Sequence, residues 1–265
     1  MVDCLTIPQE NMNDVAELEL IGVSKCFGGV HALSDVSIGF DSGKITCIIG
    51  PNGAGKTTLF NLITGNICPD TGEIRFKGEA LQGRPSHLIA RKGIGRLFQD
   101  IRIFRKMTAF ANVCVAAQHQ PGERILFSAV WPLVGWGDEA LNQKMAMEHL
   151  EFVGLGEFAN RLGEELSYGQ QKLLAIARLL NSEASCFLLD EPTAGVQPEM
   201  VAKLTQVIRG LTAKGHSVVV IEHDLGIVGE LADWVFLMDR GRIEAFGTPS
   251  EILRDSSLER LIPIH

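Results

Sequence analysis

The chain has 265 residues, 46% of them hydrophobic, and its 24 basic and 32 acidic residues give a net charge of −8. This length and apolar content suffice for one large domain with a buried core. The acidic balance excludes nucleic acid as an expected partner, because binding a phosphate backbone requires a surplus of Lys and Arg.

Local composition argues against two further classes of protein. Residues 1–17 are rich in acidic and amide side chains, so we expect a loose lead-in there and not a secretion signal. The most apolar stretch, ILFSAVWPLVGW at 125–136, contains a proline and is shorter than the roughly 20 residues of a membrane span. Six scattered cysteines without a C-x-x-C pair are typical of reduced thiols in the cytosol.

The first third of the chain predicts strands that lead into a helix. Short apolar runs within 18–49, broken by Gly, Ser and Asp, predict a small antiparallel sheet that leads into the buried strand ITCII. GPNGAGKTT at 50–58 follows, and KTTLFNLITG then has the apolar spacing of a helix with Gly65 as its C-cap. The glycine cluster is therefore expected to form a strand-to-helix turn.

Helical patterns replace β-rich runs between about residues 100 and 180, which predicts a helical insertion. CFLLDEP at 186–192 and SVVVIEH at 217–223 then predict parallel strands buried on both faces, joined by an amphipathic helix over 198–215. WVFLMDRGRIEAFG at 234–247 predicts a hairpin that turns at 239–241.

The glycine cluster fits the phosphate-binding pattern G-x-x-x-x-G-K-[ST] in full, with the required strand before it and helix after it. Backbone N–H groups and the helix start would cradle phosphate, Lys56 would reach the β- and γ-phosphates, and the Thr57 hydroxyl would ligate Mg²⁺. The residues expected to contact ATP are Gly50, Pro51, Asn52, Gly53, Ala54, Gly55, Lys56, Thr57 and Thr58.

An acidic pair at the end of the strand near 186–190 would complete the site. Asp190 can hold Mg²⁺ through water, and Glu191 can polarise the attacking water. Taken alone, such a pair could instead cap a helix. Beside a phosphate-binding loop, hydrolysis of a nucleoside triphosphate is the better interpretation.

A third motif, ELSYGQQKLLAIARLL at 165–180, resembles the L-S-x-G-Q signature of ATP-binding cassette (ABC) ATPases. The resemblance implies a second phosphate cradle at a helix start, made of Ser167, Tyr168, Gly169 and Gln170. Taken alone, this segment would be a simple helix N-cap.

The resemblance also assigns roles to isolated residues. Phe27 would stack on adenine, Gln99 would join the sheet to the helical insertion and act in Mg²⁺ binding and catalysis, and His223 would contact the γ-phosphate. One position departs from the family pattern: Gln197 stands where many cassettes have an aspartate, so a cross-dimer contact through that carboxylate is absent from this chain.

The ABC resemblance implies an α/β P-loop fold with a mainly parallel core sheet, an antiparallel β subdomain and a helical insertion. We expect one ABC ATPase domain over 18–253, with a RecA-like core and β subdomain in 18–98 and 181–253 and the helical subdomain in about 99–180. Residues 254–265 would form a tail. Two such domains, identical or paralogous, would meet head to tail and enclose ATP between the loop of one and the signature of the other.

Within the ABC family, GIGRLFQDIRIFRKMTAFANV at 93–113 and the LSYGQQ signature resemble the ATPase subunits of branched-chain amino acid importers. This implies integral membrane permease partners, an indirect periplasmic or extracellular substrate-binding protein, and a place on the cytoplasmic face of the inner membrane. Urea or amide uptake and lipopolysaccharide export remain alternatives. A soluble cassette ATPase without a permease is disfavoured, because the chain lacks a tandem cassette and a heptad-rich insertion. The stretch at 125–136, with Trp131 and Trp136, is either a permease-docking surface or part of the core.

Overall fold

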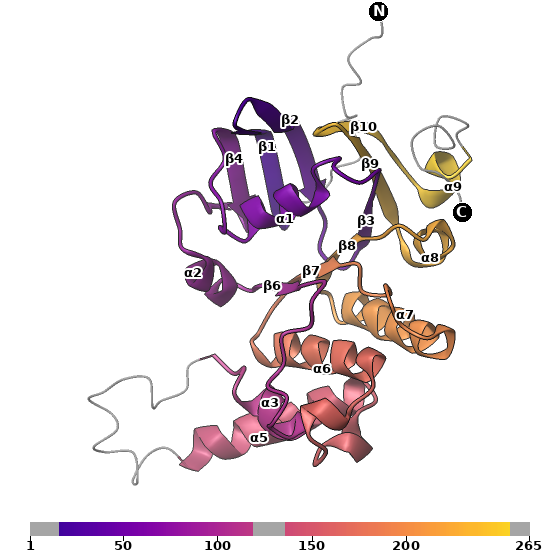
Figure 1. Ribbon diagram of the computed structural model, residues 1–265. Coiled ribbons are helices and arrows are strands. Elements are labelled where there is room, and N and C mark those ends of the chain that lie inside the picture. The colour runs from indigo at the N-terminus through magenta and orange to yellow at the C-terminus, as the bar shows by residue number, and fades with distance from the viewer. Residues whose placement is uncertain (1–15, 119–135, 255–265) are drawn as a thin grey trace, which may run out of the picture.

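The computed structural model describes residues 16–118 and 136–254, which form two β-sheets with helices packed around them (Figure 1). The larger sheet has the strand order β10-β9-β3-β8-β7-β6, and all neighbours are parallel except β9 and β10. Its central strands are entirely buried, as expected for a sheet covered on both faces. The strands are β3 (Ile45–Ile49), β6 (Ile94–Leu97), β7 (Cys186–Asp190), β8 (Ser217–Ile221), β9 (Trp234–Asp239) and β10 (Arg242–Gly247).

The smaller sheet is antiparallel and has the order β2-β1-β4-β5. Its strands β1 and β2 confirm the sheet expected ahead of the buried strand, whereas β4 and β5, which follow α1, were not predicted. The sheet begins beside Glu17, which is buried and exchanges backbone hydrogen bonds with Phe40 and Lys77. The strands are β1 (Leu18–Phe27), β2 (Val30–Phe40), β4 (Thr71–Phe76) and β5 (Glu79–Ala80).

Alternation of side chains along the central strands divides the interior into two cores. In β3, Cys47 and Ile49 face one core, and Ile48 faces the other. Helix α1 (Lys56–Ile63) and the small sheet cover the second face, whereas α6 (Tyr168–Asn181) and α7 (Pro198–Ala213) cover the first (Figure 1). The large sheet is thus held between the two layers, and its strand ends position the site.

The regular elements that the structure describes between β6 and β7 are helices and 3₁₀ turns, as the apolar spacing predicts. Helices α3 (Ala109–Cys114) and α5 (Trp136–Phe152) pack against α6. The buried Asn181 joins all three, because its amide donates to the Val113 carbonyl at 2.9 Å and its oxygen lies 3.2 Å from His149 Nδ1. The other helices and 3₁₀ turns are α2 (Ser86–Arg91), η3 (Gly156–Phe158), η4 (Gly163–Glu165), α8 (Leu225–Leu231) and α9 (Pro249–Ile252).

Two predicted turns are confirmed. The C-terminal turn of α1 closes at Gly65, whose φ of 67° places it in the left-handed region typical of helix ends. The β9–β10 hairpin turns through Arg240 and Gly241, both at positive φ. The described residues exclude the tail at 255–265 and most of the apolar stretch at 125–136. Both interpretations of that stretch, a permease-docking surface and a part of the core, therefore stand as predicted. Across 16–118 and 136–254, no helix combines the length and apolar character needed to span a bilayer.

Candidate active site

The glycine cluster forms a tight turn between β3 and α1, as expected from the sequence. Gly50 has a φ of 150°, and a Cβ there would lie 2.0 Å from the Met238 carbonyl oxygen. Gly55 has a φ of 105°, and its Cβ would lie 2.5 Å from the Ala32 carbonyl oxygen. Both clashes are with backbone atoms, which cannot rotate away. The turn therefore depends on glycine at these two positions.

The start of α1 has the features of an anion cradle. No side chain in the described part of the chain caps the helix at Gly55, and the first turn of a helix has N–H groups without intrahelical partners. A Cβ added at Gly53 would meet no described atom within 4 Å, and Thr57 is exposed. These groups fit the phosphates of a nucleotide, because the donors and the positive end of the helix dipole face open space.

Lys56, the first residue of α1, is buried beside this cradle. Its Nζ donates to the backbone carbonyls of Gly50 at 2.7 Å and Pro51 at 3.0 Å. Burial lowers the pKa of the Lys56 ammonium, and the nearby carboxylates Glu191 and Asp190 oppose that shift. The lysine is thus held by its own loop, close to the acidic pair at the end of β7.

Among the remaining loop residues, Ala54 is buried and closes the turn by donating its N–H to the Pro51 carbonyl at 3.2 Å. Asn52 is exposed and Thr58 is half-buried at the surface of the turn. Phe27 lies apart from them, at the end of β1, where its ring is 47% exposed and 5.4 Å from the Lys25 ammonium. An exposed aromatic face at this hairpin is compatible with stacking on a base.

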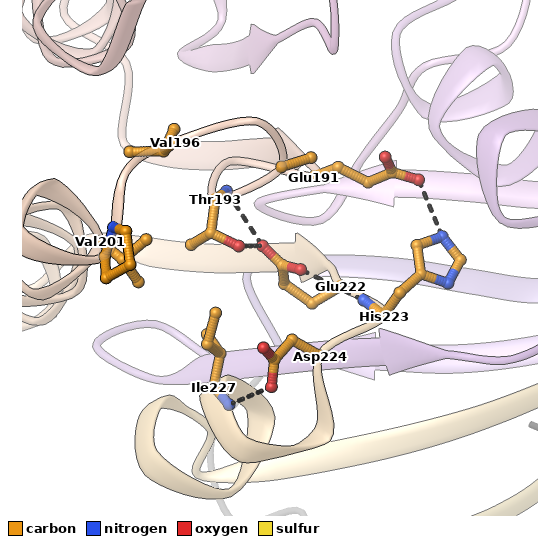
Figure 2. Close-up of a pocket in the computed structure, with 10 residues that line it drawn as sticks. Glu191, Thr193, Val196, Val201, Glu222, His223, Asp224 and Ile227 are labelled. Atoms are coloured by element: carbon orange, nitrogen blue, oxygen red, sulfur yellow. Dashed lines mark hydrogen bonds and ion pairs between the residues drawn. The ribbon is translucent and has the colours of Figure 1, made fainter. Parts of the chain in front are cut away.

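Three residues expected to act in hydrolysis converge at the carboxyl ends of the parallel strands. The Glu191 carboxylate lies 2.8 Å from His223 Nε2 through one oxygen and accepts from Gln99 Nε2 at 3.0 Å through the other. Figure 2 shows the contact between Glu191 and His223 as a dashed line. Adjacent strands bring them together, because Asp190 of β7 pairs with Ile221 of β8 in the sheet register.

Asp190 has a partner that sequence reasoning missed. Its Oδ2 lies 2.9 Å from Nη2 of Arg96, and both side chains are buried. The same guanidinium donates to Asn61 Oδ1 at 2.7 Å, which joins β6, β7 and α1. The signal in the sequence was a lone arginine inside the apolar strand GIGRLF, because a charge in such a run requires a buried partner.

The signature residues form the first turn of α6. Ser167 is the N-cap: its Oγ accepts from Gln170 N at 3.3 Å, and the Gln170 side chain accepts from Ser167 N at 2.9 Å. Gly169 is packed so closely that a Cβ would lie 2.3 Å from Met200 Cγ. Tyr168 is partly exposed, and its hydroxyl is 3.5 Å from the Gln99 carbonyl oxygen. The helix cap considered as the simpler interpretation is thus present in this structure.

A pocket of about 550 Å³ opens beside Glu191 and His223 (Figure 2). Its apolar side is formed by residues of the loop after β7, of α7 and of α8. Two buried ionisable residues were also missed by sequence reasoning: Glu222, which lines the pocket, and Lys172, which does not, and they are 3% and 1% exposed. For Lys172 the available signal was a lysine on the apolar face of an amphipathic helix.

A family model described as "ABC transporter" matches residues 33–194. The chain belongs to the ABC transporter family. The match includes the glycine-rich turn, the signature and the acidic pair, so this ABC ATPase binds nucleotide and hydrolyses ATP, as the motifs predict. The individual roles of its site residues remain predictions.

Relatives match the ABC ATPase along nearly its whole length. It is 39% identical over 236 residues to the high-affinity branched-chain amino acid transport ATP-binding protein BraF of Pseudomonas aeruginosa, covering 89% of this chain and 92% of the relative. It is 37% identical over 247 residues to the high-affinity branched-chain amino acid transport ATP-binding protein LivG of Escherichia coli K12, covering 92% and 96%.

Solved structures confirm the α/β ABC ATPase fold. A nucleotide-free ATP-binding cassette from an ABC transporter matches with a TM-score of 0.80 and 32% identity, covering 95% of this chain and 100% of that one. The ADP conformation of MJ1267, an ATP-binding cassette of an ABC transporter, matches with a TM-score of 0.81 and 33% identity, covering 93% and 98%. Gln197, the residue expected to depart from the family pattern, is the N-cap of α7 in this structure.

Proposed function

We propose that this chain is the ATP-hydrolysing subunit of an ABC importer that takes up branched-chain or related amino acids. The names of the relatives in Pseudomonas aeruginosa and Escherichia coli support the choice of solute. The observation that carries the hydrolytic part is the Glu191 carboxylate held between His223 and Gln99 at the strand ends.

The arrangement suits in-line attack of water on the γ-phosphate of ATP. Glu191 accepts a proton from the water and orients it, while Lys56 places positive charge beside the phosphate and His223 offers a hydrogen bond to it. Lys56 exchanges its two carbonyl partners for phosphate oxygens when ATP arrives. Catalysis then consists mainly of positioning and charge neutralisation.

Thr57, Asp190 and Gln99 would hold Mg²⁺ beside the phosphates. Each of the three residues has an oxygen that can still bind a cation. Thr57 is exposed, Asp190 uses only one carboxylate oxygen to pair with Arg96, and Gln99 contacts Glu191 through its amide nitrogen and not its oxygen. Oxygen ligands of this kind suit a hard divalent cation. When bound, the ion would neutralise charge on the phosphates.

A complete site requires two cassettes. The loop 50–58 of one would face residues 167–170 of a second copy or a paralogue, with Phe27 against adenine, and ATP would close the dimer. A bacterial ABC transporter cassette with 26% identity and a TM-score of 0.71 is described as a dimeric structure. We place the dimer on the cytoplasmic face of the inner membrane, bound to permease subunits that receive solute from a periplasmic or extracellular binding protein. Within each chain the core would be 18–98 and 181–253, with the helical subdomain in 99–180.

Glu191→Gln tests the hydrolytic assignment. The amide keeps the size of the side chain but cannot accept the proton, so we expect ATP binding to persist while hydrolysis falls at least about 100-fold. ATP should also trap this variant as a closed dimer, measured by light scattering. A variant that hydrolyses ATP at the rate of the unchanged chain would show that Glu191 is not the base.

Reconstitution tests the solute. The chain is combined in proteoliposomes with candidate permease subunits and a candidate binding protein, and uptake of labelled leucine, isoleucine and valine is measured with ATP inside. ATP-dependent uptake of these amino acids supports the proposal. Uptake of urea or short amides alone, or extraction of lipopolysaccharide, would select one of the alternatives.

A separate variant tests the apolar stretch at 125–136. If Trp131→Glu releases the chain from the permease, that stretch is a docking surface.

A further inference from the structure

The residue proposed as the catalytic base has an unfavourable backbone conformation. Glu191 has a φ of 47°, in the left-handed region that residues with a Cβ rarely adopt. Such a conformation persists only where surrounding contacts enforce it, and it is concentrated at functional sites. The backbone N–H of Glu191 donates to the Ile221 carbonyl at 3.0 Å, which fixes one side of the residue. The contacts on the other side therefore decide where its carboxylate points.

Lys172 supplies that second contact from inside the protein. Its side chain leaves α6, is 1% exposed, and donates from Nζ to the Glu191 carbonyl at 2.9 Å and the Ala194 carbonyl at 2.8 Å. The N–H of Ala194 also bonds to the Glu191 carbonyl, at 3.2 Å. One ammonium thus holds both ends of the short turn that begins at Glu191.

Glu222 holds the same turn from the opposite strand. Its Oε1 accepts from the Thr193 N–H at 3.1 Å and from the Thr193 hydroxyl at 2.6 Å, and its Oε2 accepts from the His223 N–H at 3.2 Å. In Figure 2 this carboxylate lies between the Glu191 loop and the His223 loop. A single buried side chain therefore connects the loops that carry the two partners of the 2.8 Å contact.

Lys172 and Glu222 carry opposite charges that attract each other through space, without a direct ion pair between them in the described structure. Burial lowers the pKa of the Lys172 ammonium, and the charges of Glu222 and Glu191 oppose that shift. Removing one member of such a pair leaves an uncompensated charge in the interior, whereas removing both does not. None of the hydrogen bonds of Lys172 or Glu222 involves the Glu191 carboxylate, so both act through the backbone that carries it.

We propose that Lys172 and Glu222 are positioning residues for hydrolysis, which hold the turn from Glu191 to Ala194 so that the Glu191 carboxylate faces His223 and Gln99. The proposal rests on the proposed function, since it takes Glu191 as the base. It also links α6, whose first turn carries the signature, to the base through one side chain. A displacement of α6 would move the Glu191 carbonyl directly.

The test separates positioning from simple stability. Full-length Lys172→Met, Glu222→Gln and the double variant are compared for kcat, for the KM of ATP, for the Kd of ADP and for melting temperature. Each single variant should melt roughly 10 °C lower, because one buried charge loses its counterpart. The double variant should regain most of that loss. The kcat of the double variant should nevertheless stay on the order of 10- to 100-fold below that of the unchanged chain, because the carbonyl contacts that aim Glu191 are gone. Its KM for ATP and its Kd for ADP should change less than about twofold.

Matched variants complete the experiment. Thr193→Ser keeps the hydroxyl that Glu222 binds and should retain kcat, whereas Thr193→Val removes it and should lower kcat without changing the Kd of ADP. Lys203 also donates to a backbone carbonyl, that of Gly154 at 2.8 Å, but on an exposed part of the surface, so Lys203→Met should leave kcat unchanged. If a single variant fails to fold, the double variant and the two Thr193 variants still distinguish positioning from stability.

A kcat that recovers together with melting temperature in the double variant would overturn the proposal, because the pair would then serve stability alone. Equal kcat values for Thr193→Val and Thr193→Ser would do the same. Glu191→Gln is measured alongside them. If that variant hydrolyses ATP normally, or if the unchanged chain does not hydrolyse ATP, the proposed function fails. If Glu191→Gln is inactive and the double variant is fully active, only the positioning fails.

Discussion

Helices α1 and α6 both start with a motif expected to face phosphate, yet their first turns differ. The start of α1 follows Gly55, and no described side chain caps it. The start of α6 follows Ser167, which forms a reciprocal capping box with Gln170. The first turn of α1 therefore has backbone N–H donors without a described side-chain partner. In the first turn of α6, the capping box already binds part of the backbone N–H donors.

This difference indicates an order of events in the proposed dimer. The backbone N–H groups at the start of α1 can receive phosphate without displacing a side-chain cap, and only Lys56 has to change its hydrogen-bond partners. At α6, the Gln170 N–H already donates to the Ser167 hydroxyl at 3.3 Å, so a phosphate of the facing cassette has to displace that bond to use this N–H. Nucleotide should therefore bind the α1 side first, and the α6 side should join only as the dimer closes.

The largest effect is expected from a substitution in the glycine-rich turn before α1. Gly50→Ala places a Cβ 2.0 Å from the Met238 carbonyl oxygen, and backbone on both sides prevents relief. We expect loss of ADP binding, measured by calorimetry, and a marked fall in melting temperature. Tight ADP binding by this variant would show that the turn can deform.

Gly169→Ala is the matched substitution on the α6 side. Its nearest obstacle is the Met200 side chain, at 2.3 Å from the added Cβ, and that side chain is flexible. ADP binding should be retained, and Met200→Ala in the same chain should restore the melting temperature. No corresponding second substitution should rescue Gly50→Ala, because a backbone carbonyl cannot be removed.

A smaller effect is expected from Gln170→Glu. Glutamate keeps the capping box and favours the positive end of the helix dipole, so the melting temperature should stay the same or rise. The added charge would repel a facing phosphate, and ATP hydrolysis should fall at least about 10-fold. Hydrolysis at the unchanged rate would place the first turn of α6 away from nucleotide.

The smallest effect separates capping from phosphate binding. Ser167→Ala removes an N-cap and should cost about 1 kcal/mol of stability, which lowers the melting temperature by roughly 2–4 °C. Thr108→Ala is its control, because Thr108 caps α3 in the same way, with its hydroxyl accepting from Ala111 N at 3.1 Å. Both variants should lose similar stability, but only Ser167→Ala should lose ATP hydrolysis. If both variants hydrolyse ATP at the same rate, Ser167 acts only as the N-cap of α6.

Much of the fold could be predicted because its signals are local. The glycine-rich turn, the apolar runs of β7 and β8 and the helix between them each depend on residues that are neighbours in sequence. The meeting of Gln99, Glu191 and His223 could be predicted because strand ends of a parallel sheet share one edge and the family motifs mark all three positions.

The remaining features depend on pairs that are distant in sequence. Arg96 and Asp190 are 94 residues apart, and neither position indicates the other. Lys172 and Glu222 are connected only through the turn after β7, whose positive φ at Glu191 follows from contacts on both sides and from no local preference. Such features arise from tertiary packing, which overrides what a residue would adopt alone.

The sheet register has a consequence for how this chain tolerates change in length. Because Asp190 lies opposite Ile221, Glu191 and His223 leave the sheet at nearly the same level. A single residue inserted into β8 would turn His223 to the other face and could leave the packing of α7 intact. Inserted length at the α7–β8 connection, where a Cβ added at Gly215 would meet no described atom within 4 Å, would keep this alignment. The edge of the sheet that carries Glu191 and His223 is therefore the edge where residue count matters most.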